Sequence, residues 1–306
     1  MVLGTGGTIA GRAGTAHDNL GYTAAQVGVQ ALLATIPAIQ GLELVAEQVA
    51  QVDSKDMGFA VWRELALRCA HWLGQPEVQG LVVTHGTDTL EETAYFLHAV
   101  LAPSKPVVLT CAMRPATALV PDGPQNLADA VALAATPGAR GVLAVCAGTV
   151  HGALEVTKSH TYRLDAFSSG DAGPIGWIEE GQLRLARNWP DVPVGRAQGA
   201  MEKIASGVSW PRVDIVMNHA GADGTIVQAL RARGVDGIVV AGTGNGSLAV
   251  PLQDALLQAV QAGVRVVRAT RCAGGRVLPH AGDVLPDSNG LSPVKARVAL
   301  LLELLA

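Results

Sequence analysis

The chain has 306 residues, of which 49% are hydrophobic and 16% charged, and its net charge is −4. This composition suits a well-buried enzyme of one large or two medium domains, and it excludes a disordered chain. The small negative charge gives no reason to expect nucleic acid or an anionic membrane as a partner.

No apolar run approaches the length of a membrane span, and the last one, 298–306, is interrupted by Glu303. The N-terminus has no basic region followed by an apolar stretch, so it does not read as a secretory signal. We therefore expect a cytoplasmic protein, with a periplasmic one as the alternative if a signal was removed from the sequence.

Short runs of Val, Ile and Leu alternate with helical patterns, which is typical of an α/β fold with a mostly parallel sheet. The expected strands are 80–84, 106–110, 141–147, 213–218, 237–241 and 265–269. The expected helices are 90–101, 126–135, 225–232, 252–262 and a last one that begins at Pro293 with Ser292 as N-cap.

Between about 189 and 211 these patterns give way to Pro, Gly and polar residues. We therefore predict a larger N-terminal catalytic α/β domain over 1–190, a linker over 191–211 and a smaller C-terminal α/β domain over 212–306.

The four cysteines lie far apart in the sequence, without any Cys-x-x-Cys pair, at Cys69, Cys111, Cys146 and Cys272. Each stands beside apolar or small residues, so we expect buried free thiols of a reducing compartment rather than disulfides. The same spacing gives no support for a zinc site.

The first chemical motif is Gly4-Thr-Gly-Gly-Thr-Ile-Ala-Gly11, which directly follows the opening strand. A dinucleotide fingerprint would need glycine where Ile9 stands, and the Gly-rich segment 242–247 fails in the same way. Glycines at the end of a strand also let a neighbouring hydroxyl stand exposed where substrate can approach, and Thr8 is that hydroxyl.

The second motif is the segment 83–93, in which Thr87 and Asp88 lie between the end of a strand and the start of a helix. Open α/β sheets bind their ligands at this edge. We expect Thr89 and Glu92 to form a capping box, which leaves Asp88 free for a ligand. His85 is expected to be a core residue rather than a general base.

Together the two motifs resemble the periplasmic-type branch of the bacterial L-asparaginase family, and the resemblance extends over nearly the whole chain. Further segments follow in the family's order and approximate spacing, namely 22–23, 27–29, 52–57, 112–115, 122–124, 156–158, 242–246 and 292–297. The resemblance implies hydrolysis of L-asparagine to L-aspartate and ammonia without a metal or organic cofactor, in a homotetramer built from intimate dimers.

By this resemblance, Thr8 is a mobile-loop nucleophile, Tyr22 is its hydrogen-bonding partner, and Thr87, Asp88 and Lys158 form a second catalytic cluster. The family's mechanism can be written with either threonine as the first nucleophile. We favour an acyl-enzyme on Thr8, which Thr87 and Lys158 help a water to hydrolyse. A threonine hydroxyl needs a neighbour that takes its proton, and a lysine that loses its charge in a dry pocket can do so.

The α-ammonium and α-carboxylate of free asparagine need partners of opposite charge. The resemblance assigns Asp88 to the ammonium and Ser54, with nearby backbone N–H groups, to the carboxylate. It also implies contact of the Ala112 carbonyl with the amide, and an Asn245 supplied by a second subunit. The full expected substrate-binding set is Ser54, Lys55, Gly86, Thr87, Asp88, Ala112 and Asn245.

Two departures from the family pattern bear on specificity. Lys55 stands where many relatives have Gln or Glu, so we expect it to point away from the ammonium or to pair with a carboxylate such as Asp88. The segment after Arg271 lacks the acidic residue that some relatives extend into a neighbouring site, and Asp283 and Asp287 are the closest substitutes. With fewer carboxylates around the ammonium, we expect asparagine to be preferred over glutamine.

Other functions remain open from the sequence alone. They are a glutaminase-asparaginase of broader specificity, an amidase acting on a modified or peptide-linked amide, a non-catalytic amino-acid-binding protein on the same fold, and a nucleotide-binding domain.

Overall fold

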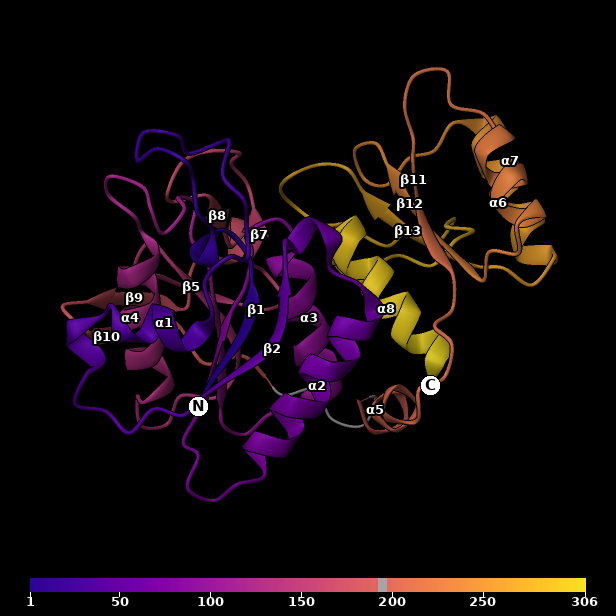
Figure 1. The fold of residues 1–306 in the computed structure, drawn as a ribbon. Helices are drawn as coiled ribbons and strands as arrows, with labels where there is room; N and C mark the ends of the chain where they lie inside the picture. The colour runs from indigo at the N-terminus through magenta and orange to yellow at the C-terminus, as the bar shows by residue number, and fades with distance from the viewer. Residues whose placement is uncertain (192–196) are drawn as a thin grey trace. The chain divides into compact units, whose positions relative to one another are not determined.

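The computed structural model describes residues 1–191 and 197–306, which form two compact units, Met1–Ala197 and Gln198–Ala306. Strands and helices alternate in each unit (Figure 1), and the α/β class expected from the sequence is confirmed. The division into 1–190, 191–211 and 212–306 remains a prediction about domain boundaries.

The segment expected to be a linker contains regular structure. Helix α5 (Ala197–Ser206) lies within it, whereas residues 192–196 are outside the described residues. Ala200 and Ile204 of this helix are buried. They are four residues apart and so share one helix face, a short pattern that the surrounding Gly and Pro residues obscure in the sequence.

The N-terminal unit is built on an eight-stranded sheet in the order β10-β9-β6-β5-β4-β3-β1-β2. Neighbouring strands from β2 to β5 are parallel, and those from β5 through β6 and β9 to β10 are antiparallel. Its strands are β1 (Val2–Gly6), β2 (Ala46–Val52), β3 (Leu81–Thr84), β4 (Pro106–Thr110), β5 (Gly141–Cys146), β6 (Thr149–Gly152), β9 (Gly176–Glu179) and β10 (Gln182–Leu185). A separate two-stranded sheet pairs β7 (Thr157–Lys158) with β8 (Phe167–Ser168).

Helices cover this sheet on both faces (Figure 1). On one face, α1 (Val29–Ala34) and α4 (Gly123–Ala134) share a buried cluster with Val2, Val82 and Val108 of the parallel strands. The other face carries α2 (Phe59–Leu73) and α3 (Leu90–Leu101), which are joined by the stacked rings of Trp62 and Phe96 at 4.7 Å between centroids. Short 3₁₀ turns occur at Thr8–Ala10, Pro37–Ile39, Ser54–Asp56 and Gly170–Ala172.

The parallel register brings four chain segments to one edge of the sheet. Gly4 pairs with Thr84, Thr84 with Thr110, and Gly6 with Val52, so β1, β2, β3 and β4 end close to one another. The residues that follow these strands include, in chain order, Thr8, Ser54, Thr87 and Ala112. Ligands of open α/β sheets bind at this edge, and the candidate residues of both motifs lie there.

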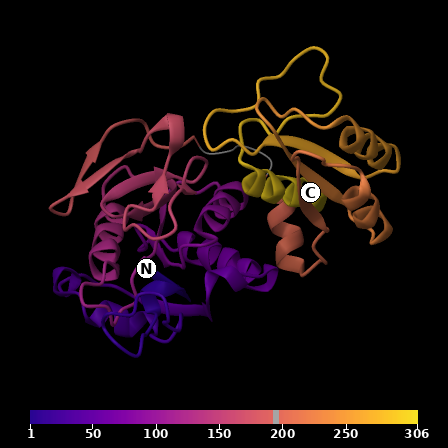
Figure 2. The ribbon, with the colours of Figure 1, turned by 90° about the horizontal axis from the view of Figure 1, so that it is seen from above.

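The C-terminal unit has a three-stranded parallel sheet in the order β11-β12-β13, formed by Val213–Met217, Gly237–Gly242 and Arg265–Thr270. Helices α6 (Thr225–Ala232) and α7 (Val250–Gln261) pack on one face and α8 (Pro293–Leu305) on the other, as both views show (Figures 1 and 2). A side chain at Gly237 would meet Leu300 at 2.8 Å, so α8 lies directly on the middle strand. The expected N-cap is confirmed, because the Ser292 hydroxyl accepts from Lys295 N–H.

All four cysteines are free thiols, as expected. Cys69, Cys111 and Cys146 are buried, but Cys272 is exposed, so the expectation that all four are buried is wrong. Cys272 stands just beyond the end of β13, in a segment without regular structure, where apolar neighbours in the sequence do not ensure burial. The Cys111 and Cys146 sulfurs lie 3.2 Å apart, at the ends of the adjacent strands β4 and β5.

Candidate active site

Thr8 lies two residues beyond the end of β1, in the turn Thr8–Ala10. Gly6 and Gly7 before it have φ values of 106° and 82°, which a residue with a side chain adopts only at a cost. The Thr8 hydroxyl is 2.6 Å from the Tyr22 hydroxyl, and the Thr8 residue is 6% exposed. The expectation of an exposed hydroxyl is therefore wrong, because the turn packs Thr8 against Tyr22. The glycines thus turn the chain so that Thr8 pairs with Tyr22, the partner expected from the resemblance.

Burial raises the pKa of Tyr22, and the negative charges of Asp53 and Asp88 add to that shift, while the bond to Thr8 opposes it. Tyr22 is therefore a neutral phenol at physiological pH. A phenol can both donate and accept a hydrogen bond, so Tyr22 can orient the Thr8 hydroxyl or exchange a proton with it.

The two threonine loops touch through their glycines. A Cβ placed on Gly7 would lie 2.4 Å from the backbone of Gly86, and one on Gly86 would lie 2.4 Å from the Ser54 hydroxyl oxygen. Only hydrogen fits at these two positions. The glycines therefore allow the loops that carry Thr8, Ser54 and Thr87 to pack backbone against backbone.

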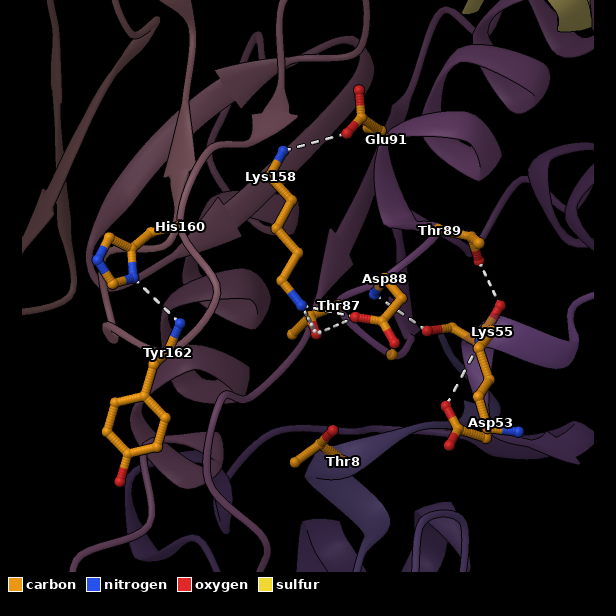
Figure 3. A network of polar contacts seen from close by, with 12 residues as sticks. Thr8, Asp53, Lys55, Thr87, Asp88, Thr89, Glu91, Lys158, His160 and Tyr162 are labelled. Carbon is orange, nitrogen blue, oxygen red and sulfur yellow. Dashed lines mark hydrogen bonds and ion pairs between the residues drawn. The ribbon is translucent and has the colours of Figure 1, made fainter. Parts of the chain in front are cut away.

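Thr87, Asp88 and Lys158 form one polar cluster (Figure 3). Lys158 Nζ donates to Thr87 Oγ1 at 2.8 Å and to Asp88 Oδ1 at 2.6 Å, and Thr87 Oγ1 is 3.4 Å from Asp88 Oδ1. The Lys158 side chain is 19% exposed and that of Asp88 is 51% exposed. Lys158 lies with His160 around a cavity of about 390 Å³ that also reaches Asp88.

Ser54 connects this cluster to the turn after β2. Its hydroxyl accepts from Asp88 N–H at 3.1 Å, and its carbonyl accepts from the Thr89 hydroxyl at 2.7 Å. The expected capping box is wrong in this respect, because the Thr89 side chain makes no capping bond to helix α3. Thr89 bonds a neighbouring turn instead, and the start of α3 is thereby fastened to Ser54.

Lys55 turns its ammonium to the neighbouring carboxylate of Asp56, and its side chain is 61% exposed. Of the two arrangements expected from the sequence, the structure has a pair with a carboxylate other than Asp88. The contact with Asp56 raises the pKa of Lys55, which is therefore charged throughout the physiological range.

His85 is fully buried beside the cluster, and its Nδ1–H donates to the Gly86 carbonyl at 2.7 Å. Burial lowers the pKa of His85 to about 4, with the bond to Gly86 opposing the shift. The ring is therefore neutral at physiological pH, and the burial agrees with the expected role as a core residue.

Ala112 is fully buried in the segment after β4. The side chain of Asn126 in α4 donates to the Cys111 carbonyl at 2.9 Å and accepts from Ala147 N–H at 3.0 Å. Asp122 accepts from the N–H groups of the two residues after Ala112. Asp122 and Asn126 were not predicted as supporting residues. Pro124 between them indicates the first turn of a helix, but it does not indicate which side chains bond the segment after β4.

Asn245 belongs to the C-terminal unit, where its amide donates to the Leu278 carbonyl at 2.9 Å and accepts from Leu278 N–H at 2.7 Å. In the same unit, Asp283 accepts from His280 N–H at 2.8 Å and pairs with Arg268 at 2.6 Å. The bond from His280 N–H is the largest cause of the lowered pKa of Asp283, and Arg268 adds to it. Asp283 is thus a carboxylate already occupied within its own unit.

The comparisons with known proteins identify the family. Residues 1–191 match the family described as Asparaginase, N-terminal, and residues 212–306 match the one described as Glutaminase/Asparaginase C-terminal domain. The chain therefore belongs to the asparaginase family, and the resemblance inferred from the two threonine motifs is confirmed.

Several relatives are similar over nearly all of the chain. L-asparaginase 2 of Bacillus subtilis is 38% identical over 99% of this chain and 81% of its own length, and L-asparaginase 2 of Escherichia coli is 39% identical over 99% and 88%. Glutaminase-asparaginase of Pseudomonas fluorescens is 36% identical over 99% and 85%. The crystal structure of a probable cytoplasmic L-asparaginase from Campylobacter jejuni superposes with a TM-score of 0.93 at 38% identity, covering 99% of this chain and 94% of that one.

Among the described residues, no three His, Cys, Asp or Glu side chains are grouped so as to hold a metal ion. None of the described helices is both long and apolar enough to cross a membrane.

Proposed function

We propose that this protein is an L-asparaginase that hydrolyses L-asparagine to L-aspartate and ammonia at the cluster around Thr8 and Thr87. The observation that carries the proposal is the contact of Lys158 Nζ with Thr87 Oγ1 at 2.8 Å and with Asp88 Oδ1 at 2.6 Å. The water that hydrolyses an acyl-enzyme needs a partner for its proton, and an amine beside a hydroxyl can supply that partner. The names of the relatives support asparagine as the substrate.

Recognition of the substrate rests on Asp88 and Ser54. Asp88 Oδ1 contacts Lys158, and because the side chain is half exposed its second oxygen remains available to an α-ammonium. Ser54 Oγ already accepts from Asp88 N–H, so its own hydrogen remains to donate to an α-carboxylate. Asp88 and Ser54, which are joined by a hydrogen bond, thus offer one acceptor and one donor to the two charged groups of an amino acid.

The proposed reaction uses two hydroxyls with different hydrogen-bond partners, Thr8 beside Tyr22 and Thr87 beside Lys158. Thr8 Oγ1 attacks the side-chain amide carbon, its proton passes to the leaving nitrogen, and ammonia departs to leave an aspartyl ester on Thr8. A water then attacks the ester while Thr87 and Lys158 take its proton. Lys158 and Thr87 return that proton to the leaving Thr8 oxygen as aspartate is released, so that one water is consumed for each ammonia formed.

Lys158 can take a proton only as the neutral amine, whereas its contact with Asp88 suits an ammonium. In our proposal the substrate ammonium replaces Lys158 as the cation beside Asp88. Binding of the substrate then lets Lys158 release its proton to solvent and serve Thr87 and the water as the neutral amine.

Glutamine is the second candidate substrate, because relatives of nearly the same identity are named glutaminase-asparaginase. A pocket distinguishes one methylene by only about 1–3 kcal/mol through packing. We propose that asparagine is preferred, since Lys55 is a cation paired with Asp56 and Asp283 is occupied by Arg268, which leaves few carboxylates for the substrate ammonium. An ammonium with few carboxylates around it has little freedom to shift, and the longer substrate then misplaces its amide.

The test is release of ammonia from asparagine and from glutamine by the purified protein, with Thr8→Ala measured beside it. We expect rapid release from asparagine, slower release from glutamine and almost none from the variant. Equal kcat/KM for the two amides would overturn the preference. No release from either amide would overturn the proposed activity and favour an amino-acid-binding protein.

We also propose a homotetramer built from intimate dimers, in which Asn245 of one chain completes the site of another. The proposal rests on the family resemblance. Two hydrogen bonds between the Asn245 amide and the backbone of Leu278 hold that side chain in place. Sedimentation equilibrium measures the assembly, and a monomer with full activity would refute it.

The compartment is proposed to be the cytoplasm, because the Campylobacter jejuni protein of the same fold is called a probable cytoplasmic L-asparaginase, although a Haemophilus influenzae relative is called a probable periplasmic one. Cell fractionation with an antibody to this chain tests this assignment.

A further inference from the structure

The strand that carries Lys158 is short and stands apart from the main sheet. β7 consists of Thr157 and Lys158 alone, and it pairs only with β8 through Ser168 and Phe167. Two residues of strand pairing give little restraint, and a long lysine side chain loses much rotamer entropy when it is held in one conformation. Something besides the β7–β8 pair has to hold the ammonium at Thr87.

Glu91 makes that connection. Its Oε1 accepts from Lys158 N–H at 3.2 Å, and its Oε2 accepts from the Thr157 hydroxyl at 3.3 Å. Figure 3 shows Lys158 stretched between two attachments, with its backbone nitrogen at Glu91 and its ammonium at Thr87 and Asp88. The carboxylate thus covers the open edge of β7, where a backbone N–H would otherwise lack a strand partner.

Glu91 is also tied to the other half of the cluster by the chain itself. It lies in the first turn of α3, three residues after Asp88 and four after Thr87. Asp88 and the N-cap residue Thr89 are both bonded to Ser54, so Glu91 keeps a nearly fixed position relative to Thr87 and Asp88. The backbone nitrogen and the ammonium of Lys158 are therefore both bonded to residues at or just before the start of α3.

We propose that Glu91 is a positioning residue, which holds the backbone of β7 so that the Lys158 ammonium meets Thr87 and Asp88. This inference rests on the proposed role of Lys158 in the reaction. Glu91 acts through the backbone and the Thr157 hydroxyl, and it contacts neither the ammonium nor the reacting atoms. A misplacement of about 1 Å in such a group lowers turnover by roughly 100-fold.

A purely structural role is the competing explanation, since an acidic residue in the first turn stabilises a helix through its dipole. Glu92 occupies the same first turn and has the same charge. Glu92→Ala is therefore the matched control for loss of a carboxylate from the start of α3. If only the helix dipole matters, the two alanine variants will change stability and activity alike.

The experiment measures kcat, KM for asparagine and the melting temperature of six variants. We expect Glu91→Ala to lower kcat roughly 10- to 100-fold with KM within about threefold of wild type. Glu91→Gln should recover kcat to within about fivefold, because its carbonyl oxygen can accept from Lys158 N–H and its amide can face the Thr157 hydroxyl. Glu92→Ala should keep kcat within about twofold of wild type, at a melting temperature close to that of Glu91→Ala.

A second pair of variants tests the same attachment from the other side. Thr157→Val removes the hydroxyl that donates to Glu91 with little change of shape, and Thr157→Ser retains it. We expect Thr157→Val to lower kcat about three- to tenfold with KM unchanged, and Thr157→Ser to resemble wild type. Equal turnover for the two Thr157 variants would show that the hydroxyl does not hold β7.

Lys158→Met, assayed beside these variants, separates failure of the inference from failure of the proposed mechanism. If Lys158→Met keeps full turnover, the proposed role of Lys158 is wrong and Glu91 has nothing to position. If Lys158→Met loses turnover while Glu91→Ala retains it, the mechanism stands and the inference about Glu91 is wrong. Loss of turnover in Glu91→Gln equal to that in Glu91→Ala would also overturn the inference. Glutamine keeps an acceptor for Lys158 N–H, so loss of that hydrogen bond could then not explain the loss of turnover.

Discussion

Replacing Asp88 by asparagine removes the negative charge while keeping an oxygen and nearly the same shape. In the protein without substrate, Asp88 Oδ1 pairs with Lys158 at 2.6 Å, and the Asp88 side chain is 51% exposed. An ion pair with this exposure contributes only about 0.2–1 kcal/mol to folding. We therefore expect Asp88→Asn to fold normally, with a melting temperature near that of wild type.

The effect on the reaction should be much larger, because a bound substrate excludes water from the carboxylate. Breaking a desolvated charge pair costs about 2–5 kcal/mol. Since half of the Asp88 side chain is open to solvent before binding, we expect the lower part of that range, about 2–3 kcal/mol. At about 1.4 kcal/mol per factor of ten, kcat/KM for asparagine should fall roughly 30- to 150-fold.

The assay is steady-state ammonia release over a range of asparagine concentrations, which separates kcat from KM. Glu179→Gln is the matched control, because it removes one carboxylate from an exposed ion pair with Arg184 on β10, where the Glu179 side chain is 56% exposed. The control should keep the wild-type kinetics. An Asp88→Asn variant with unchanged kcat and KM would refute the assignment of Asp88 to the substrate ammonium.

Three further predictions follow from the described contacts. Thr8→Ala and Thr87→Ala should each lower kcat by orders of magnitude, and the double variant should be little worse than either; additive losses in ammonia release would contradict a joint action. Gly7→Ala, with a φ of 82° and its Cβ 2.4 Å from facing backbone, should lose more thermal stability and turnover than Gly138→Ala, with a φ of 78° and open space; equal melting temperatures would contradict this. Burial lowers the pKa of His85 to about 4, so between pH 6.5 and 4 the unfolded chain binds a proton at His85 that the folded chain does not. The free energy of unfolding should therefore fall by about 3 kcal/mol as the pH decreases from 6.5 to 4, and urea unfolding of His85→Gln should show less of this loss.

Much of the sheet could be predicted because its parallel strands are short, apolar and separated by recognisable helices. Strand β4 and helices α3 and α6 have the expected bounds. Helix α4 begins at Gly123 rather than Asn126, although Pro124 in its first turn marks the earlier start. The antiparallel strands β6, β9 and β10 could not be found in the same way, since β10 is mostly exposed and lacks an apolar run.

The candidate site was predictable in part from local pattern and in part only from resemblance. Strand ends followed by glycines placed Thr8 and Thr87 at one edge of the sheet without reference to any relative. Lys158 lies 70 residues from Asp88 in a two-residue strand, and no pattern of the sequence indicates that it reaches the cluster. Glu91 was missed because a carboxylate in the first turn of a helix is common, and only the fold shows that it bonds β7.

The most direct test of the account identifies the threonine that carries the acyl group. Thr87→Ala, which should form the aspartyl ester but hydrolyse it slowly, is mixed with asparagine, quenched in acid, digested and analysed by mass spectrometry. The account predicts an aspartyl ester on the peptide that contains Thr8, absent when Thr8→Ala is treated in the same way. An ester on the Thr87 peptide of the Thr8→Ala variant, with none on Thr8 in the Thr87→Ala variant, would contradict it.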